Sequence, residues 1–160
     1  MSISAGDQIP SAPLAVMGSN GPGPVDSSEL LGSGLVVLFA VPGAFTPTCS
    51  AEHLPGFVEH AKALREKGVD RIVCMAVNDV FVMDAWGKAG NVGDDITMAA
   101  DGNGEFTRAL GLEMDASAFG MGQRCHRFAM IVRDGVVAKL LVEGPGEFRV
   151  SSAEYVLEQI

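Results

Sequence analysis

The sequence predicts an α/β fold in which helices cover a mixed sheet, and three observations support this prediction. Segments with the character of strands alternate with segments of helical spacing along most of the chain. The last two strand segments flank Asp134-Gly135, a dipeptide typical of a tight antiparallel hairpin, so the sheet is expected to mix parallel and antiparallel strands. The length of 160 residues suits one domain, residues 1–160, with a core large enough to need no disulfide bonds.

The first elements lead to one central strand. Residues 14–17 are expected to form a short strand, and residues 18–24, which are rich in glycine and proline, a turn. Residues 26–29 indicate a short helical turn. Residues 35–40 form a continuous apolar run of strand length, which predicts a strand buried on both faces.

A helix, a second buried strand and a second helix follow. Residues 50–67 have helical spacing with one apolar stripe, and Gly68 is a typical residue just after a helix end. Residues 71–77 predict a buried strand. Asp79 can cap the next helix, which carries Trp86.

The C-terminal half continues the alternation and ends in a hairpin and a helix. Residues 96–100 predict a third strand, and residues 104–110 a short helix. After a glycine-rich loop, residues 128–132 and 136–142 supply the two strands of the predicted hairpin. A capping box, Ser151-x-x-Glu154, predicts the start of the last helix.

Charge and hydropathy argue against two classes of partner. The formal net charge of −9 disfavours nucleic acid, because phosphate binding needs a clustered basic surface. No apolar run approaches the ~20 residues that cross a bilayer. The first Lys or Arg is Lys62, so the N-terminal residues resemble neither a secretion signal nor an arginine-rich transit peptide. We therefore expect a cytoplasmic protein that binds neither nucleic acid nor membranes.

The most informative candidate residue is Cys49. It follows the strand predicted at residues 35–40 and lies at the start of the helix predicted at 50–67. Free N–H groups and the positive end of the helix dipole favour a thiolate there. Free cysteines are commonly buried for packing, but Cys49 has proline and hydroxyl neighbours that are typical of turns. We interpret Cys49 as an anionic sulfur nucleophile.

A cation beside Cys49 has to come from distant sequence. No Lys or Arg precedes Lys62. The densest basic cluster is Arg124-Cys125-His126-Arg127, far along the chain. This cluster is the expected source of a positive charge that stabilises the thiolate.

These residues resemble the active-site signature of the peroxiredoxins. Pro42-x-x-x-Thr46-x-x-Cys49, followed by His-Leu-Pro-Gly-Phe at 53–57, is similar to the atypical branch called type II or type 5. Several motifs in the right order are hard to explain by chance. The likeness covers nearly the whole chain and continues in order through residues 77–86, 100–102, 122–128 and 151–154.

The resemblance implies a thioredoxin-like fold and a peroxidase in which Cys49 attacks hydrogen peroxide or an alkyl hydroperoxide. It also implies that Arg127, which precedes the aromatic residue of its strand, contacts both thiolate and peroxide; a surface ion pair is the alternative. Arg124 is expected either to brace the loop or to form a surface ion pair. A homodimer is implied as well, with Phe45 and Phe81 as contact residues unless they belong to the core.

Three residues of the loop before Cys49 are expected to support it. The Thr46 hydroxyl can turn toward the sulfur or the bound peroxide, although it can also cap the helix. Pro42 and Pro47 lack N–H groups and stiffen the loop. They are expected to shield the thiolate and fix its geometry, or to have a structural role alone.

Peroxide would convert Cys49 to a sulfenic acid that another thiol must reduce. In relatives with an internal resolving cysteine, that residue lies in the segment corresponding to residues 147–152, where this chain has none. Cys74 falls in an apolar strand, where packing is its expected role. Cys125 replaces the serine common in the family, and its basic neighbours can lower its pKa.

We therefore expect a one-cysteine cycle without a bound cofactor. The resemblance to related enzymes that lack the C-terminal cysteine implies that glutathione with glutaredoxin recycles Cys49. Thioredoxin is the competing donor, with Cys125 or Cys74 as the resolving thiol in that alternative. A redox-sensing module that signals to a partner is a second class of function that stays open.

A third class depends on His53. It lies four residues after Cys49, so the two side chains can form a Cys–His hydrolase dyad. Pro55 and Gly56 are expected to disturb the helix there. No metal is predicted, because Cys49 and His53 are only two ligands and no second pair has suitable spacing.

Overall fold

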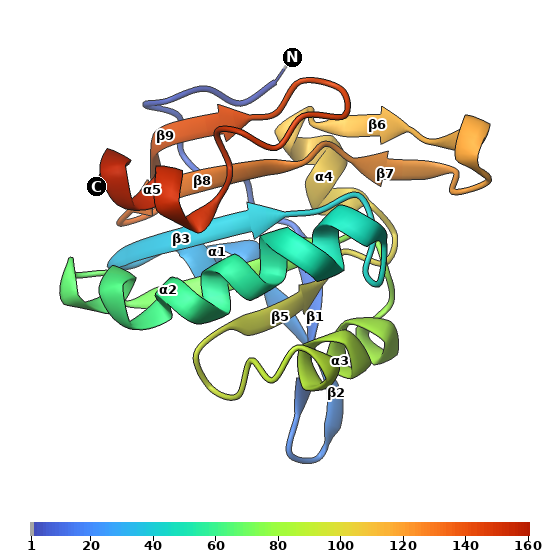
Figure 1. Ribbon diagram of the computed structural model, residues 1–160, viewed down its shortest axis with the longest axis horizontal. Helices are drawn as coiled ribbons and strands as arrows, with labels where there is room; N and C mark the ends of the chain where they lie inside the picture. Colours follow the sequence, from blue (N-terminus) through green and yellow to red (C-terminus); the bar gives the residue numbers. More distant parts are fainter. Residues whose placement is uncertain (1) are drawn as a thin grey trace.

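The computed structural model describes residues 2–160 as a mixed seven-stranded sheet with helices on both faces (Figure 1). The strands lie in the order β2-β1-β5-β4-β3-β8-β9. β3 is parallel to β4 and β4 to β5, and the remaining neighbours are antiparallel. The predicted α/β class with a mixed sheet is therefore confirmed. The strands of this sheet are β1 (Pro13–Gly18), β2 (Gly21–Asp26), β3 (Leu35–Ala40), β4 (Arg71–Ala76), β5 (Thr97–Ala100), β8 (Phe128–Arg133) and β9 (Val136–Val142).

The helices divide between the two faces of the sheet. Buried side chains of α2, α3 and α5 pack on one face, and those of α1 and α4 pack on the other (Figure 1). No helix within residues 2–160 is both long and apolar enough to cross a membrane. The helices are α1 (Ser27–Leu31), α2 (Leu54–Glu66), α3 (Val80–Ala89), α4 (Glu105–Leu110) and α5 (Ala153–Gln159), with a π-helix η1 (Cys49–His53) and a 3₁₀-helix η2 (Ser117–Phe119).

Strand β3 lies in the interior of the sheet and is the strand from which the chain passes to Cys49. All six of its residues are buried, as the apolar run predicts. Alternate side chains contribute to different cores: Val37 and Phe39 pack with α2, whereas Val36 and Leu38 pack on the opposite face. The carboxyl end of β3 is thus fixed on both sides.

One predicted turn is wrong. Residues 21–26 form strand β2, which pairs antiparallel with β1 and closes a hairpin at Gly18 and Gly21. β2 is the edge strand of the sheet and has only β1 as a neighbour. Pro22 and Pro24 lie at alternate positions, so their missing N–H groups point the same way, which an edge strand tolerates on its open side.

The C-terminal hairpin forms as predicted. Asp134 and Gly135 join β8 and β9 with positive φ angles of 48° and 82°, the geometry of a tight hairpin turn. The glycine-rich loop before it contains a second, unpredicted hairpin of β6 (Glu113–Asp115) and β7 (Gln123–Cys125). Strands of three residues are too short to show a period in sequence.

The last helix begins one residue later than the capping box indicates. Ser152, and not Ser151, is the cap, because its hydroxyl oxygen accepts from the Tyr155 N–H at 3.2 Å. Ser151 is buried, and its hydroxyl donates to Glu143 at 2.7 Å. The serine that local sequence assigns to the helix cap therefore binds the carboxylate of Glu143, eight residues earlier.

Candidate active site

Cys49 lies just past the carboxyl end of β3, at the beginning of the helix that continues into α2. The helical residues start at Pro47, where a missing N–H costs nothing. The Ser50 N–H donates to the Thr46 carbonyl at 2.9 Å and so closes the first turn. The Cys49 side chain is fully buried. The thiol therefore occupies a helix start, where backbone dipoles favour negative charge.

The segment that follows is a π-helix and not a regular α-helix. The Leu54 N–H donates to the carbonyl of Cys49, five residues earlier. Pro55 gives a reason: in a regular α-helix its ring would press on the carbonyl of Ala51, four residues earlier, and the wider turn relieves that clash. The disturbance expected near Pro55 is thus present and spans Cys49–His53.

Arg127 supplies the cation that contacts Cys49. Its Nη2 lies 3.0 Å from the Cys49 Sγ, and its Nη1 lies 2.8 Å from Nδ1 of His53. The sheet explains how a residue so distant in sequence reaches the thiol: Ala40 at the end of β3 pairs with Phe128 at the start of β8, so Arg127 follows at the same edge. The Phe148 ring lies 5.8 Å from the guanidinium carbon, within range of a cation–π contact.

His53 is a neutral imidazole whose two nitrogens have fixed roles. Its Nε2 lies 2.9 Å from the carbonyl oxygen of Ser151, which can only accept, so Nε2 carries the proton. Its Nδ1 faces Arg127, which can only donate, so Nδ1 carries a lone pair. Burial, together with the charge of Arg127, lowers the pKa of His53 to about 3. His53 therefore orients Arg127 and has no nitrogen left for Cys49 or for a metal ion.

The low pKa of His53 predicts that stability falls in mild acid. The unfolded chain protonates this histidine near pH ~6.5, whereas the folded chain does so only near its pKa of about 3. Its stabilising contribution is complete above pH ~6.5 and is lost as pH falls, by up to about 1.4 kcal/mol per pH unit. We expect urea unfolding between pH ~6 and ~5 to show this slope.

His53→Gln is the matched comparison for that titration. Glutamine keeps one donor and one acceptor but does not titrate. The other histidines, His60 and His126, are present in both proteins, so they do not contribute to the difference between the two pH dependences. The free energy of unfolding of the variant should therefore change less with pH than that of the wild type. If the free energy of unfolding had the same slope against pH in the two proteins, the lowered pKa of His53 would be contradicted.

The loop residues before Cys49 take different positions. The Thr46 hydroxyl donates to the Gly43 carbonyl at 2.7 Å, so in this conformation it closes the loop and its hydrogen does not point to sulfur. The oxygen of that hydroxyl can still accept a hydrogen bond. Pro47 begins the helix, and Pro42 lines the cleft described below.

Arg124 braces the surrounding loops. Its Nε donates to the Met121 carbonyl at 2.9 Å, and its Nη1 donates to the Val77 carbonyl at 3.0 Å. It therefore joins the end of β4 to the loop before β7. Of the two arginines in the basic cluster, Arg127 is the one that contacts Cys49.

The expectation that basic neighbours lower the pKa of Cys125 is wrong. Burial is the main reason that its pKa rises to about 12, with smaller contributions from Asp101 and Cys49. Cys125 is fully buried, and its Sγ donates to the Val41 carbonyl at 3.1 Å. The two flanking arginines direct their guanidinium groups to other partners. Cys125 is therefore a protonated thiol in the core.

Cys74 is also a core thiol. It is fully buried in β4, and burial raises its pKa well above the usual range of a cysteine. It belongs to the same core as Cys49, whereas Cys125 belongs to the core on the other face of the sheet. All three cysteines are free.

A cleft of about 360 Å³ opens beside Arg127. Pro42 and Thr48 contribute to it, so the cleft borders the segment that carries Cys49. A peroxide group is far smaller than this volume. Most of the remaining wall is apolar and comes from the β6–β7 hairpin and the loop after β9, through Met114, Ala116, Phe119, Met121 and Pro145.

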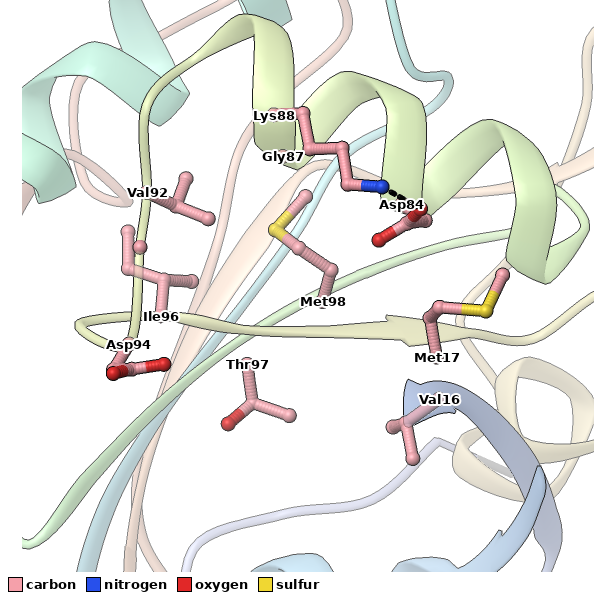
Figure 2. Close-up of a pocket in the computed structure, with 11 residues that line it drawn as sticks. Val16, Met17, Asp84, Gly87, Lys88, Val92, Asp94, Ile96, Thr97 and Met98 are labelled. Atoms are coloured by element: carbon pink, nitrogen blue, oxygen red, sulfur yellow. Dashed lines mark ion pairs between the residues drawn. The ribbon is translucent and has the colours of Figure 1, made fainter. Parts of the chain in front are cut away.

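Another hollow lies between α3 and the strands β1 and β5 (Figure 2). Asp84 and Lys88 of α3 form an ion pair at 2.9 Å beside it, and Met17 and Met98 point toward the helix from the two strands. This hollow includes none of the predicted site residues. It is therefore separate from the cleft at Arg127.

Three residues near the site were not predicted from sequence. Phe148 lies against both Arg127 and His53, the Ser151 carbonyl fixes His53, and Glu143 holds the segment that contains Ser151. The local pattern gives no signal for either residue: Phe148 contacts residues far away in sequence, and Glu143 binds backbone N–H groups of the irregular turn that follows it. The sequence indicates Ser151 only as a helix cap.

Comparisons with known proteins show which family this chain is related to. The family model described as Redoxin matches residues 4–157. Peroxiredoxin-2B of Arabidopsis thaliana is 46% identical over 99% of this chain and 98% of its own length. The chloroplastic Peroxiredoxin-2E-2 of Oryza sativa subsp. japonica is 49% identical over 99% of this chain and 72% of its own length. The crystal structure of reduced Prx3 from Vibrio vulnificus in complex with hydrogen peroxide is 50% identical, covers 98% of both chains and gives a TM-score of 0.94.

Proposed function

The chain belongs to the peroxiredoxin family of thiol-dependent peroxidases, and from this we propose that Cys49 is the residue with which it reduces hydrogen peroxide and alkyl hydroperoxides. The α/β sheet described above is the thioredoxin-like fold of this family. One observation carries the proposal: Arg127 Nη2 lies 3.0 Å from the Cys49 Sγ at the start of a helix. A guanidinium fixed in this way stabilises the thiolate that attacks peroxide.

The proposed reaction forms one bond and breaks one. The Cys49 thiolate attacks one peroxide oxygen, the S–O bond forms as the O–O bond breaks, and the released hydroxide or alkoxide takes a proton from solvent. Negative charge develops on the leaving oxygen, so a donor beside the sulfur stabilises the transition state. Arg127 can supply that donor, and the Thr46 hydroxyl oxygen can accept from the peroxide. Pro42 and Pro47 would limit the motion of the loop around the thiolate.

We propose that an external thiol returns the oxidised Cys49 to its reduced form. Residues 147–152 contain no cysteine, and both Cys74 and Cys125 are fully buried thiols with raised pKa values. A thiol that stays protonated attacks sulfenic acid slowly. Glutathione with glutaredoxin is the proposed donor, thioredoxin is the competing one, and no bound cofactor takes part.

A reductant panel with intact-mass analysis tests this scheme. One equivalent of peroxide should add a single oxygen to Cys49, located by peptide mapping. Glutathione should then restore the reduced mass without leaving an internal disulfide, and glutaredoxin should accelerate steady-state peroxide consumption. An internal disulfide that only thioredoxin reduces would contradict the glutathione route. Oxidation without turnover in every arm would favour a redox sensor.

The hydrolase alternative has a specific observation against it. Both ring nitrogens of His53 are engaged, one with Arg127 and one with the Ser151 carbonyl. A Cys–His dyad needs a histidine nitrogen that accepts the thiol proton. We therefore propose a peroxidase and not a cysteine hydrolase.

We also propose a homodimer in a reducing compartment such as the cytoplasm. Phe45 and Phe81 are 55% and 63% exposed, and Phe45 has a positive φ of 63° that turns it outward from the loop before Cys49. Exposed aromatic side chains are typical of protein interfaces. Light scattering after size-exclusion chromatography measures the mass, and Phe81→Glu should shift it toward the monomer. Cell fractionation decides the compartment.

A further inference from the structure

A single carboxylate anchors the segment that lies behind His53. The side chain of Glu143, just after β9, accepts hydrogen bonds from the backbone N–H groups of Arg149, Val150 and Ser151, each at 2.8 Å. It also accepts from the Ser151 hydroxyl at 2.7 Å. Burial alone would raise the pKa of Glu143, but these hydrogen bonds together lower it. The turn before α5 is therefore built around one negative charge.

An unbroken series of contacts connects this anchor to the thiol. The Ser151 carbonyl accepts from His53 Nε2 at 2.9 Å, and His53 Nδ1 accepts from Arg127 at 2.8 Å. Arg127 then reaches the Cys49 sulfur at 3.0 Å. The Glu143 N–H also donates to the Arg127 carbonyl at 3.0 Å. Glu143 is thus connected to Arg127 in two ways, directly through its backbone N–H and indirectly through its carboxylate, Ser151 and His53.

We infer that Glu143 is a positioning residue for the reaction at Cys49: its carboxylate sets the place of the Ser151 carbonyl, which fixes the His53 tautomer and thereby the direction of the Arg127 guanidinium. This inference rests on the proposed function of Cys49. The hydrogen-bonding groups of Ser151, His53 and Arg127 support this inference. A carbonyl forces the proton onto Nε2, and only an unprotonated Nδ1 can receive the guanidinium.

Loss of the Glu143 carboxylate would allow His53 to adopt its other tautomer. Without the Glu143 carboxylate, three N–H groups and one hydroxyl lose their shared acceptor, and the segment at 149–151 has to find others. If the Ser151 carbonyl moves, Nδ1 of His53 is free to carry the proton instead. A protonated Nδ1 would meet the guanidinium with a second donor and turn it away from sulfur. A displacement of about 1 Å at such a group can cost about a hundredfold in rate.

The first test measures the imidazole itself. In the wild type, ¹H–¹⁵N NMR of the three histidines should show His53 protonated at Nε2 with Nδ1 as acceptor. Glu143→Ala should convert this to a mixture of tautomers, and Glu143→Gln, which keeps one oxygen acceptor, should lie between the two. The matched control is Glu154→Gln, which removes the same charge from an exposed position in the first turn of α5. Unchanged His53 signals in a folded Glu143→Ala protein would overturn the inference.

The second test is a double-mutant cycle with Arg127. Glu143→Ala should slow oxidation of Cys49 by peroxide about ten- to a hundredfold. In an Arg127→Lys background the same change should have less than about a threefold effect, because the group that Glu143 positions is gone. Equal losses in both backgrounds would mean that Glu143 only stabilises the fold. The NMR arm does not depend on peroxide turnover, so failure of the proposed peroxidase function and failure of this inference give different results.

Discussion

Replacement of Cys49 by serine is expected to abolish peroxide consumption while the protein stays folded. A serine hydroxyl remains protonated at neutral pH and cannot be oxidised to a sulfenic acid, so the S–O bond of the proposed reaction cannot form. The substitution is small, and the hydroxyl can still accept from Arg127. The measurement is peroxide consumption with glutathione and glutaredoxin, with intact mass before and after one equivalent of peroxide.

Cys125→Ser is the matched control for this experiment. Cys125 is as buried as Cys49, and a serine at this position can donate to the Val41 carbonyl as the thiol does at 3.1 Å. We expect its rate in the glutathione-coupled assay to stay within about twofold of the wild type, since the change removes no group from the site. A large loss of activity in Cys125→Ser would overturn the one-cysteine cycle.

Most of the fold could be predicted because its elements have strong local signals. The six apolar residues of β3 and the Asp134-Gly135 turn between β8 and β9 were found with the correct type and nearly correct ends. Strand β2 was missed because Pro22 and Pro24 are unfavourable in most strands, and only its place at the sheet edge makes them acceptable. That place depends on pairing with β1, which local sequence does not specify.

The candidate site was predictable only in part for a similar reason. A thiol at a helix start and a distant basic cluster are visible in sequence. That Arg127, and not Arg124, contacts Cys49 follows from the pairing of β8 with β3, which sets Arg127 beside the end of β3. The contact of His53 with Ser151 joins residues 98 positions apart and involves a backbone carbonyl. Because every residue has such a carbonyl, side-chain types alone could not identify this partner.

Burial accounts for the one chemical prediction that failed. Charged neighbours in sequence affect a thiol only if their side chains point toward it. Along a strand, adjacent residues point to opposite faces, so Arg124 points away from Cys125 and binds the Val77 carbonyl. Arg127 lies between β7 and β8 and binds Cys49 instead. Because a thiolate is unfavourable in the core, burial raises the pKa of Cys125.

Replacement of Arg127 by leucine is expected to reduce the second-order rate of Cys49 oxidation about 10²- to 10³-fold. The change removes the donor at 3.0 Å from the sulfur and leaves a buried thiol with no cation in contact. It also removes the side-chain donor that lies 2.8 Å from Nδ1 of His53. Stopped-flow measurement of peroxide reduction in a single turnover separates this step from recycling by external thiols.

Two further variants distinguish a fixed donor from simple positive charge. Arg127→Lys keeps the charge, but an ammonium cannot span Cys49 and His53 as the planar guanidinium does, so we expect an intermediate loss. Arg133→Leu removes the same charge from the exposed far end of β8, about 20 Å along the strand, and should leave the rate nearly unchanged. If Arg127→Lys matched the wild type, net charge alone would suffice. If Arg127→Leu also matched it, Arg127 would have no part in the reaction, and the cation that activates Cys49 would have to be sought elsewhere.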